Sequence, residues 1–123
     1  MSQKKILVVD DSATIREIVG DALRGEGFAV EEAADGDEGL KVAKDFRPDV
    51  VILDLTMPKR DGLDVAADLR ADPQTAHAKI IMLTVRDSEF DKMVGKELGA
   101  DQYLAKPFDS RTLLDAVANI LRK

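Results

Sequence analysis

The chain has 123 residues, of which 45% are hydrophobic and 34% charged, a balance typical of one soluble globular domain rather than of a disordered chain. Its 24 acidic residues outnumber the 18 basic ones and give a net charge of −6, which opposes direct binding to nucleic acid or to an anionic membrane surface. The absence of cysteine excludes disulfides, thiolate metal sites and cysteine nucleophiles, and no apolar run is long enough for a signal peptide or a membrane span, so we expect a cytoplasmic protein.

Segments with a strand pattern and segments with a helix pattern alternate along the chain. Apolar runs predict buried strands over residues 6–9, 50–54 and 80–84. Residues 28–33, which alternate only partly and carry charge, and the short segment 103–105 predict two edge strands. A helix is expected after each strand: between Ser12 and Gly25, from Asp35 to Phe46, between Gly62 and Asp72, from Ser88 to Gly99, and from Asp109 or Ser110 to Leu121.

Five repeats of strand followed by helix, with no linker between them, predict one α/β domain over residues 1–123. Strands joined by helices run parallel, and the helices cover both faces of the sheet. The pattern therefore predicts a doubly wound, five-stranded parallel sheet with five helices.

Polar side chains follow four of the five predicted strands: Asp10 and Asp11, then Asp54, then Thr84, then Lys106. The carboxyl ends of parallel strands lie along one side of a sheet, where ligands bind, so these side chains are expected to converge. Three neighbouring carboxylates repel one another, and a hard cation such as Mg²⁺ is the usual remedy. Lys106 and Thr84 then suit an anion held opposite the metal.

A metal, a carboxylate and a lysine around one gap indicate a phosphoryl-transfer site, in which an aspartate can act as nucleophile and become an acyl phosphate. The plainer alternative is that each acid only caps a helix or ends a turn, as most single acids after a strand do. The coincidence of suitable groups at four strand ends favours the site.

The chain resembles the response-regulator receiver domains of two-component systems, of the single-domain, chemotaxis-regulator type, over essentially its whole length. The resemblance rests on the motifs LVVDDS (residues 7–12), LDLTMP (53–58), DG (61–62), LT (83–84) and YLAKPF (103–108). It implies a flavodoxin-like sheet with the strand order 2-1-3-4-5, which the pattern of the residues alone does not give.

The resemblance also implies how the acids act. Asp54 would accept a phosphoryl group from a phosphohistidine on a histidine kinase or a histidine phosphotransfer protein. Asp11, Asp54 and the backbone carbonyl of Thr56 would bind Mg²⁺ directly, and Asp10 would reach it through water. Mn²⁺ is expected to be able to replace Mg²⁺.

Phosphorylation would then work as a switch. Thr84 and Lys106 would bind the phosphoryl oxygens, and the Lys106–Pro107 peptide bond would be cis. Movement of Thr84 toward the phosphoryl group, with Tyr103 rotating inward behind it, would alter the surface of the fourth helix, fifth strand and fifth helix. Hydrolysis of the acyl phosphate would reset the switch, so the chain would catalyse only its own phosphotransfer and dephosphorylation. The downstream protein target stays open.

Three positions beside the expected phosphoryl site vary within the family. Val85 is larger than the small residue common there, and we expect it to slow phosphotransfer. Thr56 and Arg86 are expected to tune the lifetime of the phosphoryl group. Receivers that dimerise to drive DNA-binding domains often carry two acids before the strand-five tyrosine, whereas this chain has Asp101 and Gln102, so we expect a monomer.

Other classes of protein share part of the pattern. An aspartate-nucleophile phosphatase commonly has a second acid two residues after the nucleophile, where this chain has Thr56. A nucleotide-binding flavodoxin-like protein has a glycine-rich loop after its first strand, where this chain has Asp10, Asp11 and Ser12. A phosphorylation-independent scaffold would not need the full set of site residues.

Overall fold

The computed structural model describes residues 3–55, 57, 61–84 and 100–122. Its strands are β1 (Lys5–Val9), β2 (Ala29–Ala33), β3 (Val50–Asp54), β4 (Lys79–Thr84) and β5 (Gln102–Ala105). Its helices are α1 (Ala13–Gly25), α2 (Gly36–Phe46), α3 (Gly62–Ala71) and α5 (Ser110–Leu121). The helix predicted between Ser88 and Gly99 falls outside the described residues.

The five strands form one sheet in the order β2-β1-β3-β4-β5, and every neighbouring pair is parallel. This confirms the predicted doubly wound fold and its strand order. β1, β3 and β4 lie inside the sheet, and the charged β2 and the short β5 are its edges, as the sequence predicts.

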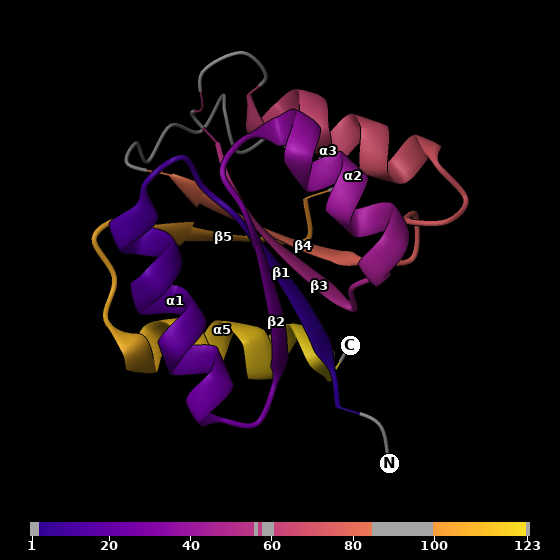
Figure 1. The fold of residues 1–123 in the computed structure, drawn as a ribbon. Helices are drawn as coiled ribbons and strands as arrows, with labels where there is room; N and C mark the ends of the chain where they lie inside the picture. Colours follow the sequence, from indigo (N-terminus) through magenta and orange to yellow (C-terminus); the bar gives the residue numbers. More distant parts are fainter. Residues whose placement is uncertain (1–2, 56, 58–60, 85–99, 123) are drawn as a thin grey trace.

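Helices cover both faces of the sheet (Figure 1): α1 and α5 lie on one face, α2 and α3 on the other. Because successive side chains of a strand point to opposite faces, Leu7 and Val9 pack toward α2 and α3, whereas Ile6 and Val8 pack toward α1 and α5. All four are fully buried. A strand buried on both faces is therefore an unbroken apolar run, and any charged residue at its end lies next to the core.

Each described helix begins with a capping side chain that accepts a hydrogen bond from a backbone N–H three residues on. The caps are Ser12 for α1, Asp35 for α2, Asp61 for α3 and Asp109 for α5. Of the two starts considered for the last helix, Asp109 is the cap and Ser110 the first helical residue. The caps of α1, α2 and α5 follow the carboxyl ends of β1, β2 and β5 by two to four residues, so these helix starts lie at the edge of the sheet where the polar strand ends converge.

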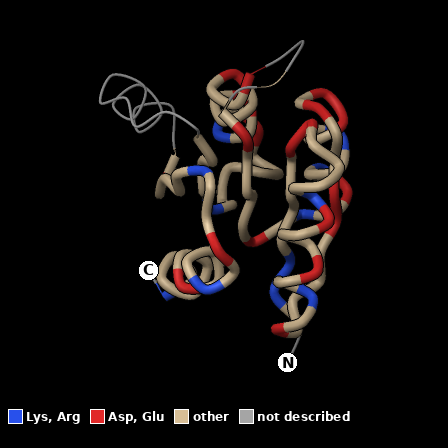
Figure 2. The backbone as a smooth tube through the Cα atoms, turned by 90° about the vertical axis from the view of Figure 1, so that its left-hand side faces the viewer, with Lys and Arg blue, Asp and Glu red and all other residues tan. Residues whose placement is uncertain are grey.

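Charged residues are distributed over the outside of the described chain. Figure 2 shows acidic residues along most of the tube with basic ones between them, and no basic stripe runs along the described part. None of the described helices is long and apolar enough to cross a membrane.

Candidate functional site

The acidic cluster consists of Asp10, Asp11 and Asp54, which come from the ends of two adjacent strands. One carboxylate oxygen of each lies within 4.8 Å of the other two. Asp10 follows β1 and has no exposed surface, whereas Asp54, the last residue of β3, is 5% exposed. Asp11 is exposed. The cluster is therefore open to solvent on the side of Asp11 and closed behind Asp10.

Lys106 reaches the cluster from the end of β5. Its Nζ lies 3.0 Å from Oδ2 of Asp10 and 3.5 Å from Oδ1 of Asp54. Its backbone is fixed by a 2.7 Å hydrogen bond from its N–H to the carbonyl of Thr84, the last residue of β4. The structure thus brings together Asp10, Asp11, Asp54 and Lys106, and it places the backbone of Thr84 beside Lys106.

Charge balance tests whether a divalent cation fits this cluster. If the three carboxylates and Lys106 are ionised, two negative charges remain uncompensated, and two of the carboxylates are almost fully buried. Buried charge of one sign is costly unless it is paired. Mg²⁺ is usually bound by one or two carboxylates and keeps several waters, and the open side at Asp11 leaves room for such waters. The donor set therefore fits Mg²⁺.

Both carboxylate oxygens and the backbone N–H of Asp10 have hydrogen-bond partners. Its Oδ1 accepts a 2.9 Å hydrogen bond from the backbone N–H of Ser12, and its Oδ2 contacts Lys106. Its backbone N–H continues the pairing of β1 with β2 by donating to the carbonyl of Ala33 at 3.1 Å. Such a carboxylate is oriented before any ligand arrives.

Thr84 and Tyr103 lie on neighbouring strands. Thr84 ends β4 and is 4% exposed, while Tyr103, in β5, is partly buried and packs against the core cluster that faces α2 and α3. The Lys106–Pro107 peptide bond is cis, the conformation that the resemblance implies. The remaining predicted site positions, Thr56, Val85 and Arg86, fall outside the described residues.

The model of the response regulator receiver domain family matches residues 6–118. The chain belongs to this family. Its receiver domain is 46% identical over 120 residues to the alkaline phosphatase synthesis transcriptional regulatory protein PhoP of Bacillus subtilis, covering 98% of this chain and 49% of PhoP. The chain thus spans about half the length of that curated relative.

Solved structures of receiver domains superpose on the whole fold. The chemotaxis protein CheY4 of Vibrio cholerae is 39% identical with a TM-score of 0.94, and the match covers 97% of this chain and 99% of that one. The receiver domain of the sensor histidine kinase PA1611 of Pseudomonas aeruginosa is 27% identical with a TM-score of 0.89, covering 99% of this chain and all of that one. That structure has a magnesium ion coordinated in its active-site cleft.

Beside the acidic cluster, the receiver domain carries an apolar hollow of about 530 Å³. It is lined by Ile15 and Ile18 of α1 and by Lys106, Pro107 and Phe108 after β5. Ile18 is 51% exposed, the largest exposure of a large hydrophobic residue in the described chain. This hollow was not predicted from the sequence, because the exposure of Ile18 is seen only in the structure.

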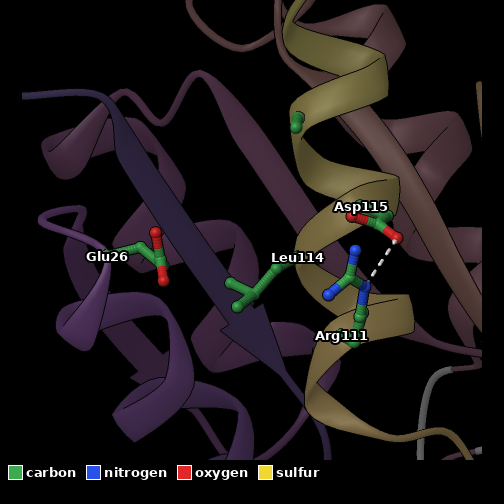
Figure 3. A pocket seen from close by; sticks show the side chains of 5 residues that line it. Glu26, Arg111, Leu114 and Asp115 are labelled. Atoms are coloured by element: carbon green, nitrogen blue, oxygen red, sulfur yellow. Dashed lines mark ion pairs between the residues drawn. The ribbon is translucent and has the colours of Figure 1, made fainter.

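A second hollow, of about 440 Å³, lies between the end of α1 and α5. Figure 3 shows Leu114 of α5 pointing into it, between Glu26 and the ion pair of Arg111 with Asp115. The nitrogen and oxygen of that pair are 3.9 Å apart on exposed side chains, a geometry that contributes little stability. None of the polar strand-end residues lines this hollow, so it is separate from the acidic cluster.

Sequence reasoning also missed two residues that contact the backbone of the acids. Gly62 begins α3 so close to β3 that an added Cβ would lie 2.4 Å from the carbonyl oxygen of Asp54. Arg16 of α1 donates a 2.7 Å hydrogen bond to the carbonyl of Asp10. Only the DG motif pointed toward the first, and no spacing rule points to the second.

Proposed function

We propose that this receiver domain is a phosphorylation-activated signalling switch in which Asp54 accepts a phosphoryl group from a phosphohistidine. The observation that carries the proposal is the position of Lys106, whose ammonium lies within 3.5 Å of both Asp10 and Asp54 at the edge of the acidic cluster. A carboxylate nucleophile, a cation beside it and further carboxylates for a metal are the parts that phosphoryl transfer to aspartate needs.

In the proposed transfer, a carboxylate oxygen of Asp54 attacks phosphorus. The bond between phosphorus and the imidazole nitrogen breaks, and the nitrogen keeps the electron pair as the donor histidine becomes neutral. Lys106 and Thr84 bind phosphoryl oxygens, the first through its charge and the second through its hydroxyl. In the reset reaction, water attacks phosphorus, Asp54 leaves as a carboxylate, and inorganic phosphate is released.

Mg²⁺ is the proposed cofactor, held by Asp11, Asp54 and the backbone carbonyl of Thr56, with Asp10 acting through water and Mn²⁺ able to substitute. The charge balance of the cluster supports a divalent cation, as does the magnesium ion in the cleft of the PA1611 receiver domain. When bound, the metal would supply positive charge that lets an anionic carboxylate approach an anionic phosphoryl group. Asp10 keeps its orientation through the hydrogen bond from Ser12.

The proposed phosphoryl donor is a histidine kinase or a histidine phosphotransfer protein that docks on the apolar hollow. Lys106 lines both the hollow and the acidic cluster, so a protein seated on Ile15, Ile18 and Phe108 would hold its phosphohistidine next to Asp54. The exposed Ile18 gives such a partner an apolar contact.

The proposed output lies on the other side of the phosphoryl group. Thr84 moves toward it, Tyr103 rotates inward, and the surface of the fourth helix, β5 and α5 changes its affinity for a downstream protein. Tyr103 is partly buried, which supports an equilibrium between two positions of the ring. A single domain over residues 1–123, a monomeric state and a cytoplasmic location belong to the same proposal.

The test is to incubate the protein with Mg²⁺ and a small acyl phosphate and to measure its intact mass. The wild type should gain one phosphoryl group that is lost on standing, and Asp54→Asn should gain none. A stable adduct, or equal labelling of Asp54→Asn, would contradict the proposed acceptor. Turnover of an unrelated phosphate ester would favour the phosphatase alternative.

The switch can be followed separately, because the chain has one tyrosine and no tryptophan, so its intrinsic fluorescence reports Tyr103 alone. Beryllofluoride with Mg²⁺, which mimics the phosphoryl group, should change this fluorescence in the wild type and leave Thr84→Ala close to its starting value. An unchanged wild type that is nevertheless phosphorylated would remove Tyr103 from the switch and leave Asp54 as the acceptor.

A further inference from the structure

Arg16 contacts the acidic cluster from behind, through the backbone rather than through a carboxylate. One nitrogen of its guanidinium, Nη1, donates to the carbonyl oxygen of Asp10 at 2.7 Å. Its Nε lies 3.6 Å from Oε1 of Glu32 on the edge strand β2. The side chains of Arg16 and Glu32 are only 19% and 29% exposed, so this contact is partly shielded from water.

Glu32 is itself held in place. Its other carboxylate oxygen, Oε2, lies 3.1 Å from Nη2 of Arg24. Arg24 lies on the same face of α1 as Gly20, one helical turn after it. A Cβ added to Gly20 would come within 2.9 Å of Arg24 and 3.1 Å of Glu32, so the glycine leaves the room that these side chains occupy. Arg16, Glu32 and Arg24 therefore form a row of alternating charge between α1 and β2 that ends at the carbonyl of Asp10.

The carbonyl of Asp10 belongs to the peptide unit that joins Asp10 to Asp11. The preceding peptide unit is fixed by the hydrogen bond from the Asp10 N–H to Ala33. Because a peptide unit is planar, fixing its carbonyl oxygen also fixes the N–H of Asp11 and the direction in which the chain leaves Asp10. Asp11 is exposed, so the direction of its carboxylate depends on this backbone more than on side-chain packing.

We infer that Arg16, held by Glu32, is a positioning residue that orients the Asp10–Asp11 peptide and thereby aims both carboxylates at the divalent cation. This inference rests on the proposed metal site and extends it to residues that touch neither the metal nor the phosphoryl group. Groups that orient metal ligands commonly change metal affinity by tenfold or more when they are removed.

Electrostatics gives a sharp test, because charge and position predict opposite signs for the same substitution. Arg16 is a cation near three carboxylates, so by Coulomb's law alone its removal should tighten Mg²⁺ binding. If its role is to orient the peptide, its removal should weaken Mg²⁺ binding. Arg24 is the matched comparison: it has the same charge, helix and glutamate partner, but within the described part of the chain it donates hydrogen bonds to Val30 and Glu32 and not to Asp10.

In the experiment, the wild type and four variants are titrated with MgCl₂ in the absence of any phosphoryl donor, and binding is monitored by the chemical shifts of the amide groups in NMR. The variants are Arg16→Met, Arg16→Lys, Glu32→Gln and Arg24→Met. Arg16→Met should bind Mg²⁺ about tenfold more weakly than the wild type, and Glu32→Gln should also bind Mg²⁺ more weakly. Arg16→Lys, whose ammonium can still donate to the carbonyl, should recover part of the affinity. Arg24→Met, which frees only one carboxylate oxygen of Glu32 and leaves the contact of Arg16 with Asp10 in place, should lose much less affinity than Arg16→Met.

Two further measurements separate positioning from a general loss of structure. Without metal, the amide nitrogen shift of Asp11 should move clearly more in Arg16→Met than in Arg24→Met, since that nitrogen is bonded to the carbonyl that Arg16 contacts. With a small acyl phosphate, Arg16→Met should need more Mg²⁺ for half-maximal labelling yet approach the wild-type rate at saturating Mg²⁺.

Unchanged or tighter Mg²⁺ binding in Arg16→Met would overturn the inference and leave the proposed function standing. A wild type without Mg²⁺ affinity would instead overturn the proposed metal site, and the inference with it. Should Arg16→Met fail to fold, Arg16→Lys carries the test, because it keeps the charge and changes only the geometry of the contact. Wild-type affinity in both Arg16→Lys and Glu32→Gln would overturn the inference.

Discussion

The ammonium of Lys106 lies 3.0 Å from Oδ2 of Asp10, a carboxylate without exposed surface that is 96 positions away in the chain. The contact joins the ends of β1 and β5, which have β3 and β4 between them in the sheet. Lys106 is the ion-pair partner of the Asp10 carboxylate in the described part of the chain.

Replacing Lys106 with methionine should destabilise the metal-free protein by about 2 kcal/mol, because a buried carboxylate loses its charged partner. The loss is smaller than for a fully buried pair, since Lys106 is 16% exposed and Asp10 keeps its hydrogen bond from Ser12. Urea unfolding in the presence of EDTA measures it. Lys41→Met, which removes an exposed lysine of α2, is the control, and an equal loss in both variants would contradict the role of the ion pair.

Replacing Asp11 with asparagine should have the opposite effect on the metal-free protein. Removing one of three neighbouring carboxylates relieves their repulsion, so the melting temperature in EDTA should rise. In the wild type, Mg²⁺ binds the folded state and should raise the melting temperature. In Asp11→Asn this increase should largely disappear. Glu17→Gln removes the same charge from an exposed position on α1 and should retain that gain.

Much of the fold follows from residue patterns that the structure confirms. Val50–Asp54 is a strand with the expected bounds. Its four apolar residues are buried on both faces of the sheet, so none of its first four positions faces solvent. β4 begins one residue earlier than expected, at Lys79, whose N–H pairs with the carbonyl of Asp49. A backbone hydrogen bond of this kind cannot be predicted from the pattern of polar and apolar side chains. The strand order likewise came from the resemblance and not from periodicity.

The candidate site was predictable as far as topology determines it. Residues at the carboxyl ends of parallel strands must lie at one edge, so the meeting of Asp10, Asp54 and Lys106 follows from the fold. The contact of Arg16 with the Asp10 carbonyl was not predictable from the sequence. A flexible arginine side chain can reach many acceptors, and its spacing from Asp10 in the chain does not indicate which one it contacts. The closeness of Gly62 to β3 depends on how α3 packs, which spacing does not fix either.

Replacing Gly62 with alanine should destabilise the protein by about 2 kcal/mol or more, because the new Cβ meets backbone that cannot move cheaply. It would lie 2.4 Å from the carbonyl oxygen of Asp54 and 2.8 Å from Cα of Leu55. The displaced strand end should also slow phosphorylation of Asp54. Gly25→Ala is the matched control: apart from its chain neighbours and its own helix, nothing lies within 4 Å of its added Cβ, and alanine in place of a helical glycine stabilises by up to about 0.5–1 kcal/mol, the value for a helix interior. Urea unfolding of both variants should therefore give changes of opposite sign.

The acid sensitivity of α5 should depend on its cap. The backbone N–H of Thr112, and next its hydroxyl, lower the pKa of the Asp109 carboxyl below its ordinary value of 3.8 by hydrogen bonding to the ionised form. A lowered pKa in the folded state means that ionised Asp109 contributes stability that is fully present above pH 3.8. That contribution is lost as the pH falls through the lowered pKa.

Asp109→Asn keeps a capping oxygen but cannot be protonated in this range, so it should resemble the wild type at neutral pH and lose less stability below pH 3.8. The measurement is the difference between the two unfolding curves as a function of pH. All other acids titrate in both proteins, so the difference isolates Asp109. A difference that stays constant from neutral pH down to the acid limb would contradict the assigned hydrogen bonds, because only a group with unequal folded and unfolded pKa values makes stability depend on pH.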